Sequence, residues 1–448
     1  MRRPRALVAP FVLIGLILPC AAHAQEERSP GLPFADRIDW TFHFDAGLGV
    51  FGFNNSLYTN PRPDPSGDLS DNWWEGFAKP GISASYEFEG GELYGTASVA
   101  GERTFGVSPD LVGGDANSYG FEEANIGWRS GDALSGLGED ALDFTFGRAQ
   151  YNLGTGFLLW DGAGEGGSRG GYWSNARKAF ELAGIGRLNT GAHRLEAFYL
   201  DRDETPEGDT GSELWGANYE LTLFDRLTLG ATYMGWSAID SLAPERDGLS
   251  VYDFRVSATP VPSVPITIDG EYAIESNGDL LDSTGWYLQA SYPFESVGWT
   301  PTPYYRYASF QGDDPETDAN EAFDSLFPGF YDWGTWWQGE IAGEYFLGNS
   351  NLLSHMFRVH ASPSGSVGTG LIYFIFTADE PAAYCGEEGC ATEDDLAFEL
   401  DFYLDWSIND NFLVSFVGAW ATPGDAIEQA FGRVDDFTYG MIYMAYSF

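Results

Sequence analysis

The chain has 448 residues and a formal net charge of −45, with 22 Lys and Arg against 67 Asp and Glu. This charge argues against a nucleic-acid partner, because phosphate binding requires a basic surface. Aromatic residues make up 16% of the chain and glycines number 57, a composition that favours strands and turns over helices.

The first 24 residues have the features of a secretory signal peptide. A basic start is followed by an apolar run over 7–18 and by the cleavage pattern Ala22-His23-Ala24. We expect residues 1–24 to be removed, which leaves 25–36 as a periplasmic N-terminal segment. No later segment approaches eighteen uninterrupted apolar residues, so a helical membrane span is not expected.

From residue 37 onward, apolar and polar residues alternate with the period of two that a β-strand requires. Ile38, Trp40 and Phe42 share one face of the first such segment, and Asp39 and His43 share the other. Similar segments follow one another without a linker. This pattern is typical of a transmembrane β-barrel with apolar residues toward lipid. Because backbone groups in lipid must be paired, we predict a closed antiparallel barrel over 37–448.

The connections determine the number of strands. Short turns such as 89–91 and 224–226 alternate with long connections such as 149–178, and both termini should be periplasmic, which requires an even count. Of nineteen candidate strands we reject 333–346, whose aromatic doublets fit neither face. The prediction is eighteen strands, with 311–351 as one long external or lumen-folded loop; sixteen strands is the alternative.

The last residues, "TYGMIYMAYSF", are predicted to be the closing strand, paired with the strand that begins at Arg37. Phe448 and Tyr446 form a terminal aromatic pattern that resembles the signal by which barrel-assembly machinery accepts its clients. That machinery is therefore an expected partner.

Charged residues on the strands are expected to point into the lumen, because charge on the lipid face costs a few kcal/mol. They are pore-lining candidates that either filter solutes or form ion pairs that stiffen the wall. The candidates are Arg129, Arg255, Arg306, Arg358, Asp269, Glu271, Glu399 and Asp401, with Glu87, Glu123, Asp253, Glu275 and Asp405 on the same face.

The glycine-rich stretch over 147–178 is too long for a hairpin turn, and long loops in compact domains are usually functional or disordered. If it folds into the lumen, Arg148, Arg169 and Arg177 can form a constriction that contacts anionic or hydroxylated solutes. The alternative is an external lid. The register of the preceding strand sends Arg148 outward unless a bulge at Gly147 reverses it.

Other sites are few. Cys385 and Cys390 are disulfide candidates, since an exported protein meets an oxidising compartment. The four histidines of the mature chain show neither triad nor metal spacing, so we expect no enzyme activity, no metal and no cofactor.

Three segments resemble those of alginate-export-type outer-membrane channels: "FGRAQYNLGTG" (146–156), "WSNARKAF" (173–180) and "FDSLFPGF" (323–330). The resemblance implies an eighteen-stranded channel. An alginate conduit needs a positive pathway, whereas this chain is acidic, so a different small or oligomeric solute is favoured.

The sequence thus predicts a passive channel in the outer membrane of a Gram-negative bacterium. Its expected contacts are outer-membrane lipid, lipopolysaccharide and a hydrophilic solute. Two alternatives remain, an outer-membrane enzyme and a closed structural or adhesion barrel. Measurements of hydrolysis and of conductance distinguish them.

Overall fold

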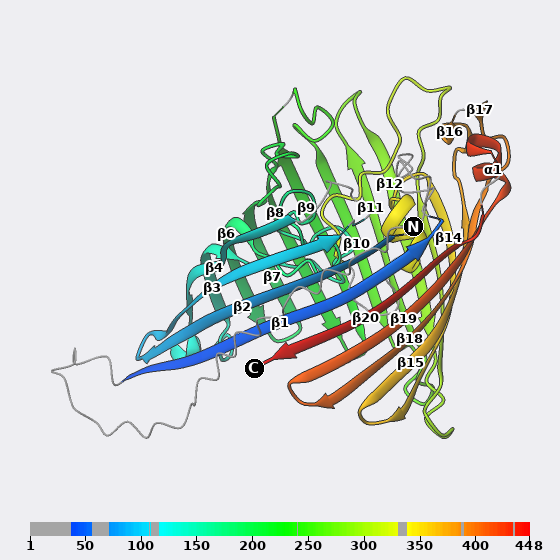
Figure 1. Cartoon of the computed structure of the whole chain (residues 1–448). Helices are drawn as coiled ribbons and strands as arrows, with labels where there is room; N and C mark the ends of the chain where they lie inside the picture. Colours follow the sequence, from blue (N-terminus) through cyan, green and yellow to red (C-terminus); the bar gives the residue numbers. More distant parts are fainter. Residues whose placement is uncertain are drawn as a thin grey trace, which may run out of the picture. The chain divides into compact units, whose positions relative to one another are not determined.

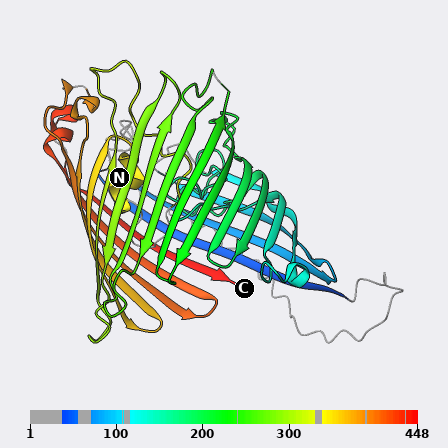
Figure 2. The same cartoon turned by 180° about the vertical axis from the view of Figure 1, so that it is seen from behind.

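The computed structural model describes residues 37–55, 71–106, 108, 116–239, 241–329, 338–386, 389–432 and 435–448. The predicted signal peptide and the segment 25–36 lie outside these residues. Residues Asp39–Phe448 form one compact unit, a single eighteen-stranded antiparallel sheet closed into a barrel (Figures 1 and 2). The predicted fold class and strand number are therefore confirmed.

Each strand pairs with its neighbours in chain order. The barrel strands are β1 (Ile38–Asn54), β2 (Asp71–Phe88), β3 (Gly91–Gly106), β4 (Ala116–Arg129), β5 (Leu142–Ala149), β6 (Phe180–Thr190), β7 (His193–Asp201), β8 (Glu213–Leu223), β9 (Leu227–Ser237), β10 (Ser250–Ala258), β11 (Thr267–Ser276), β12 (Asp282–Ser291), β13 (Thr302–Phe310), β14 (Leu352–Ser364), β15 (Val367–Thr377), β18 (Asp395–Asn409), β19 (Phe412–Pro423) and β20 (Phe437–Ser447). A separate hairpin holds β16 (Cys385–Gly386) and β17 (Gly389–Cys390).

The last strand closes the barrel against the first. β20 pairs with β1 from Asp45 opposite Ser447 to Asn54 opposite Thr438. Beyond this ladder, the backbones of Phe44 and Phe448 exchange two hydrogen bonds of 3.0 Å. The terminal Phe is therefore part of the paired sheet, and the predicted closure is confirmed.

The two faces of the wall differ as the alternation predicts. On β1, Trp40 and Phe42 point outward and are 56% and 68% exposed. The side chains of Phe51 and Trp73 point inward and are buried, with their rings stacked 4.8 Å apart. An apolar outer face is suited to lipid, whereas the inner face packs against chain that lies in the lumen.

The connections distinguish two ends of the barrel. At one end, called the short-turn end, five tight turns join the strands: 89–90, 191–192, 224–226, 365–366 and 410–411. Three other connections at this end, 130–141, 259–266 and 292–301, are longer than the short turns expected there. The opposite end, called the long-loop end, holds the long connections.

The described part of the rejected strand 333–346 is helical. Gly339–Phe346 is one π-helical segment, and 330–337 lies outside the described residues. β13 ends at Phe310 and β14 begins at Leu352, which confirms a single connection over 311–351. No helix in the described part of the chain has the length and apolar character needed to cross a membrane.

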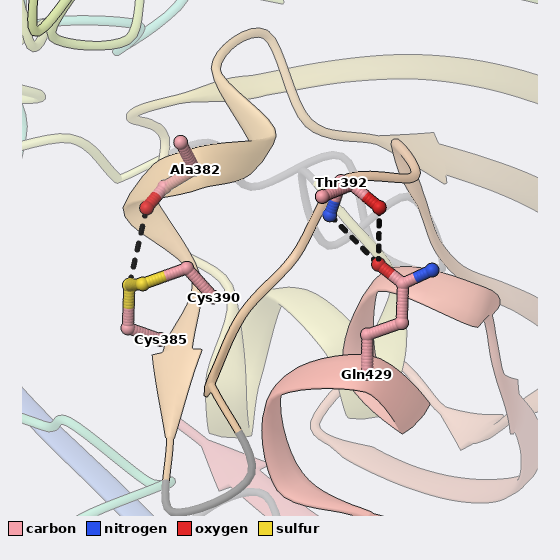
Figure 3. Close-up of a disulfide and its surroundings, with 5 residues drawn as sticks. All are labelled: Ala382, Cys385, Cys390, Thr392 and Gln429. Carbon is pink, nitrogen blue, oxygen red and sulfur yellow. Dashed lines mark hydrogen bonds between the residues drawn. A yellow bond between two sulfur atoms is a disulfide. The ribbon is translucent and has the colours of Figure 1, made fainter.

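A disulfide joins Cys385 and Cys390 across the β16–β17 hairpin at the long-loop end (Figure 3). The short helix α1 (Asp425–Phe431) lies beside it. The side-chain oxygen of Gln429 accepts hydrogen bonds from the backbone N–H of Thr392 (2.7 Å) and of Glu393 (3.2 Å). The hairpin connection and the β19–β20 connection are thus held together.

Candidate functional site in the barrel lumen

The connection 150–179 lies inside the barrel. The Phe157 ring is buried, and its centroid lies 5.5 Å from Tyr287 and 5.9 Å from Phe310. Tyr287 and Phe310 are inner-face residues of β12 and β13. The loop is therefore folded into the lumen, as one of the two alternatives predicted, and is not an external lid.

A bulge at Gly147 turns the chain toward the lumen. The register of β5 against β6 shifts between Gly147 and Ala149, and Gly147 has a φ of +116°. A Cβ atom there would lie 2.4 Å from the carbonyl oxygen of Ala124, so only glycine fits. Phe146 still points outward, whereas Arg148 points inward. The structure thus contains the bulge that the sequence required.

The three predicted arginines meet at one carboxylate, that of Asp203. Arg169 Nη2 donates to Asp203 Oδ1 at 2.8 Å, and Arg148 and Arg177 both contact Oδ2. All four side chains are largely buried. The sequence analysis missed Asp203, because an acidic residue in a polar connection has no distinguishing pattern among 67 acids.

These neighbouring arginines stabilise the ionised form of Asp203. Burial alone would raise the pKa of its carboxyl group, but the guanidinium groups of Arg148, Arg177 and Arg169 outweigh burial and lower it. Arg169 is additionally bound to the backbone, with hydrogen bonds to the carbonyl oxygens of Gly164 (2.9 Å) and Asp203 (3.0 Å). The cluster therefore clamps the loop to the β7–β8 connection.

A second segment, 311–329, also enters the lumen and is held by aromatic rings. The Phe323 ring lies against Gly285 on the inner face of β12, where an added Cβ would be 2.7 Å from the ring. The Phe327 ring has the guanidinium carbons of Arg202 and Arg246 at 4.1 and 5.1 Å from its centroid. Cation–π contacts of this kind contribute about 0.5–2 kcal/mol each.

The two lumen segments also bind each other. The backbone N–H of Phe327 donates to the carbonyl of Leu158 (3.0 Å), and Trp160 N–H donates to the Phe327 carbonyl (2.9 Å). Gly329 N–H donates to the Gly156 carbonyl (3.0 Å). The described part of the second motif, residues 323–329, therefore lies beside 156–160, where the first motif ends.

Several inward carboxylates of the wall accept hydrogen bonds from the loops. Glu75 Oε2 accepts from the backbone N–H of Trp173 (2.9 Å) and Ser174 (2.8 Å). Glu275 accepts from the N–H of Asp324 (2.9 Å), and Glu271 accepts from the Thr155 hydroxyl (2.9 Å). These acids hold lumen segments in place.

This role changes the picture of the predicted pore-lining residues. The strand candidates lie on the inner face as expected, but several are buried, and Glu271, Glu399 and Asp401 bind lumen segments. Those that are buried are Arg177, Arg306, Arg358, Glu271, Glu399 and Asp401. Arg358 donates to the Tyr403 hydroxyl at 2.7 Å, and that hydroxyl also meets His360 at 2.8 Å. The sequence could not show which part of the wall the loops cover.

A belt of alternating charge remains partly exposed near the short-turn end. It runs across four strands from Arg129 to Asp143 (3.2 Å), from Asp143 to Arg187 (3.6 Å) and from Arg187 to Glu196 (3.0 Å). Glu92 on β3 extends it by pairing with Arg129 at 3.1 Å. The Arg129 side chain is 37% exposed. Both predicted interpretations, solute contact and wall stiffening, fit this belt.

The belt continues toward β11 through hydrogen bonds. Asn218 donates to Glu196 at 2.8 Å, and Arg255 bonds to Asn218 and pairs with Asp253. Asp269 accepts a hydrogen bond from the Ser257 hydroxyl at 2.7 Å. Within the described residues, no group of three or more His, Cys, Asp and Glu side chains is arranged to hold a metal ion.

A closed eighteen-stranded barrel with loops folded into its lumen has the architecture of an outer-membrane porin. No family model and no curated sequence matches the chain. Among solved structures, Pseudomonas aeruginosa OccK5 (OpdH) is similar with a TM-score of 0.60 and 10% sequence identity, over 91% of this chain and 97% of that one. Pseudomonas aeruginosa OpdQ is similar with a TM-score of 0.56 and 11% identity, over 93% of this chain and 98% of that one. Pseudomonas aeruginosa OpdK, solved with vanillate, is similar with a TM-score of 0.57 and 12% identity, over 91% of this chain and 98% of that one.

At these identities the similarity shows a shared fold, that of outer-membrane porins. It does not bear on the alginate-export resemblance, which remains a prediction.

Proposed function

We propose that this chain is a channel in the outer membrane of a Gram-negative bacterium, through which a small or oligomeric hydrophilic solute passes without a cofactor or covalent chemistry. The observation that carries the proposal is the belt of charged side chains exposed inside a barrel whose outer face is apolar. The similarity in fold to outer-membrane porins supports it. The long-loop end then faces outward and the short-turn end faces the periplasm.

In this proposal the charges of the lumen and the loop over 147–178 set the selectivity. Arg148, Arg169 and Arg177 place three positive charges in a confined space beside two carboxyl groups, those of Asp203 and Glu165. A site with low-dielectric walls focuses such a field onto passing ions. An outer-membrane enzyme and a closed adhesion barrel remain the alternatives, and the absence of conductance would favour them.

Planar-bilayer recording with a salt gradient tests both parts of the proposal. The purified barrel should conduct, and R148Q/R169Q/R177Q should shift the reversal potential toward cation preference. The comparison is R202Q, which removes one nearby guanidinium that is bound to Asp161 and lies over the Phe327 ring, and it should shift the potential less than the triple variant does. A barrel with neither conductance nor solute uptake in liposomes would contradict the channel, whereas an unmoved reversal potential would contradict only the role of the loop.

The solute can be approached with a small panel in the liposome assay. Because the similar protein OpdK was solved with vanillate, this small aromatic acid is a reasonable first probe. The resemblance to alginate-export channels makes a uronate oligomer the second, and a neutral sugar of similar size serves as the reference. The acidic composition of the chain favours a solute other than alginate.

We further propose that Phe448 and Tyr446 form the signal read by barrel-assembly machinery. Both side chains point outward, and the Phe448 backbone completes the ladder with Phe44. Deletion of Phe448 should lower the amount of heat-modifiable barrel in membranes while leaving the conductance of inserted channels unchanged. Normal insertion of the deletion variant would contradict this role.

A further inference from the structure

A third piece of chain occupies the lumen, on the side of β18, β19 and β20. It is the π-helical segment Gly339–Phe346, which contacts these three strands. Gln338, Glu340, Ile341 and Ala342 are buried. The segment belongs to the same connection as 311–329. The contacts of the Phe323 and Phe327 rings hold only 311–329, so the position of this segment requires a separate explanation.

The carboxylate of Glu399 binds the backbone of this segment with both oxygens. Ile341 N–H donates to Oε1 at 2.8 Å and Ala342 N–H donates to Oε2 at 2.7 Å. The neighbouring Asp401 accepts a longer bond of 3.4 Å from Glu340 N–H. Hydrogen bonds to an ionised acceptor are about twice as strong as neutral ones.

The neighbours of Glu399 on the two adjacent strands are apolar. The inward neighbours across the sheet are Phe374 on β15 and Ala421 on β19. Among the described residues, Glu399 takes part in no ion pair, and Arg358 on β14 lies opposite Ile372 on β15. A buried carboxyl group requires hydrogen-bonded partners, and here two backbone amides supply them.

The turn is shaped to admit the carboxylate. Gly339 has a φ of +87°, and a Cβ atom there would lie 2.4 Å from Glu399 Oε1. Only glycine combines this backbone conformation with so close an approach. Gly339 in the lumen segment and Glu399 on the wall, which are 60 residues apart in the sequence, are thus complementary in shape.

We propose that Glu399 is a positioning residue, which holds the 338–347 segment against β18–β20 and thereby narrows the channel on that side. It was predicted from the sequence as a candidate charge filter, but its two oxygens are committed to the backbone. The inference rests on the proposed function only in treating the lumen as the path of the solute.

A thiol-accessibility experiment tests this role without relying on conductance. In A342C, the reporter is the single free thiol of the mature chain, because Cys385 and Cys390 are joined in a disulfide. A membrane-impermeant maleimide should label A342C slowly, and A342C/E399A about tenfold faster, as expected for the loss of hydrogen bonds to a charged group. E399Q, which keeps one acceptor oxygen, should fall between them, and E399D should partly restore slow labelling.

The matched control is E75A, which removes the carboxylate that binds Trp173 and Ser174 in the other loop. A342C/E75A should label as slowly as A342C alone, whereas S174C/E75A should label faster than S174C. Heat-modifiable mobility on gels reports folding, and if E399A fails to fold, E399Q carries the test. The proposal would be overturned if A342C is labelled at the same rate with and without Glu399. It would also be overturned if A342C/E75A is labelled as fast as A342C/E399A. Conductance should rise in E399A; a silent barrel would contradict the channel but leave the labelling result decisive.

Discussion

Two segments enter the lumen from the long-loop end and are held there by different physical means. The 150–179 loop is clamped by charge, with three guanidinium groups on the carboxylate of Asp203. The 311–329 segment is held by shape, with the Phe323 ring against Gly285 and the Phe327 ring near two arginines. Both sets of contacts hold irregular backbone in place inside the barrel.

The difference predicts different sensitivities. An ionic clamp depends on the ionisation of one carboxyl group, and removing that group takes away the acceptor that three buried guanidinium groups share. The packing of an aromatic ring does not depend on pH, but an added side-chain volume disrupts it, because protein interiors are close-packed. Single substitutions and pH can therefore weaken one set of anchoring contacts and leave the other set formed.

The largest effect is expected from filling the Phe323 socket. G285V places a side chain where the ring lies, at 2.7 Å, so the ring must leave. F323A removes the ring and leaves the wall intact, at a cost of about 3–5 kcal/mol. Both variants should raise single-channel conductance, because they release 311–329. If G285V closes the channel or leaves conductance unchanged while F323A raises it, the ring is not held by this socket.

Removal of the ionic clamp should have the next largest effect. D203A leaves three guanidinium groups without their shared acceptor, a loss of about 3–5 kcal/mol for a buried pair that loses one partner. The reversal potential should move toward anion preference, because the local positive charge is no longer offset. D324N, which loosens the bond between Asp324 and Arg246 in the other segment, is the control and should shift the potential much less. An equal shift of the reversal potential in both variants would mean that Asp203 influences ion selectivity no more than Asp324 does.

These two segments also show what the sequence could and could not predict. Alternation with a period of two determined the barrel, its closure through Phe448 and the inward direction of Glu399, because each strand residue has one of only two faces. The bulge followed from the conflict between Phe146 and Arg148. Asp203 and the Gly285 socket could not be predicted, because contacts between loops depend on tertiary packing that has no period along the chain.

Acid should release the clamp and spare the aromatic segment. The pKa of Asp203 is lowered, so its contribution to loop docking is fully present above the ordinary value of about 4 and is lost only as the pH falls through the lowered value. A163C, at a buried position whose backbone bridges to Asp203, should therefore react with an acid-tolerant thiol reagent below about pH 4, but not between pH 5 and 7. D203N should lack this acid step. An acid step of the same size at a thiol placed in the 323–327 region, for example S325C, would contradict the distinction.

The smallest effect is expected where the charge is most exposed, in the belt at the short-turn end. Arg194 pairs with Glu196 at 2.8 Å, but its side chain is 45% exposed, and Glu196 is also held by Arg187 and Asn218. Exposed ion pairs contribute about 0–1 kcal/mol, so R194Q should leave the thermal stability of the barrel nearly unchanged.

The reversal potential should nevertheless move slightly toward cation preference in R194Q, because one exposed positive charge is lost from the lumen, and raised salt should abolish the shift by screening. R187Q is the matched comparison, since Arg187 bridges Asp143 and Glu196 and is half as exposed as Arg194, at 24% against 45%. Its removal should lower stability more and should resist screening more than that of Arg194. If R194Q destabilises the barrel as much as R187Q does, the exposed part of the belt stiffens the wall and is not a solute contact. The cluster of arginines at Asp203 would then be the part of the lumen that sets ion selectivity.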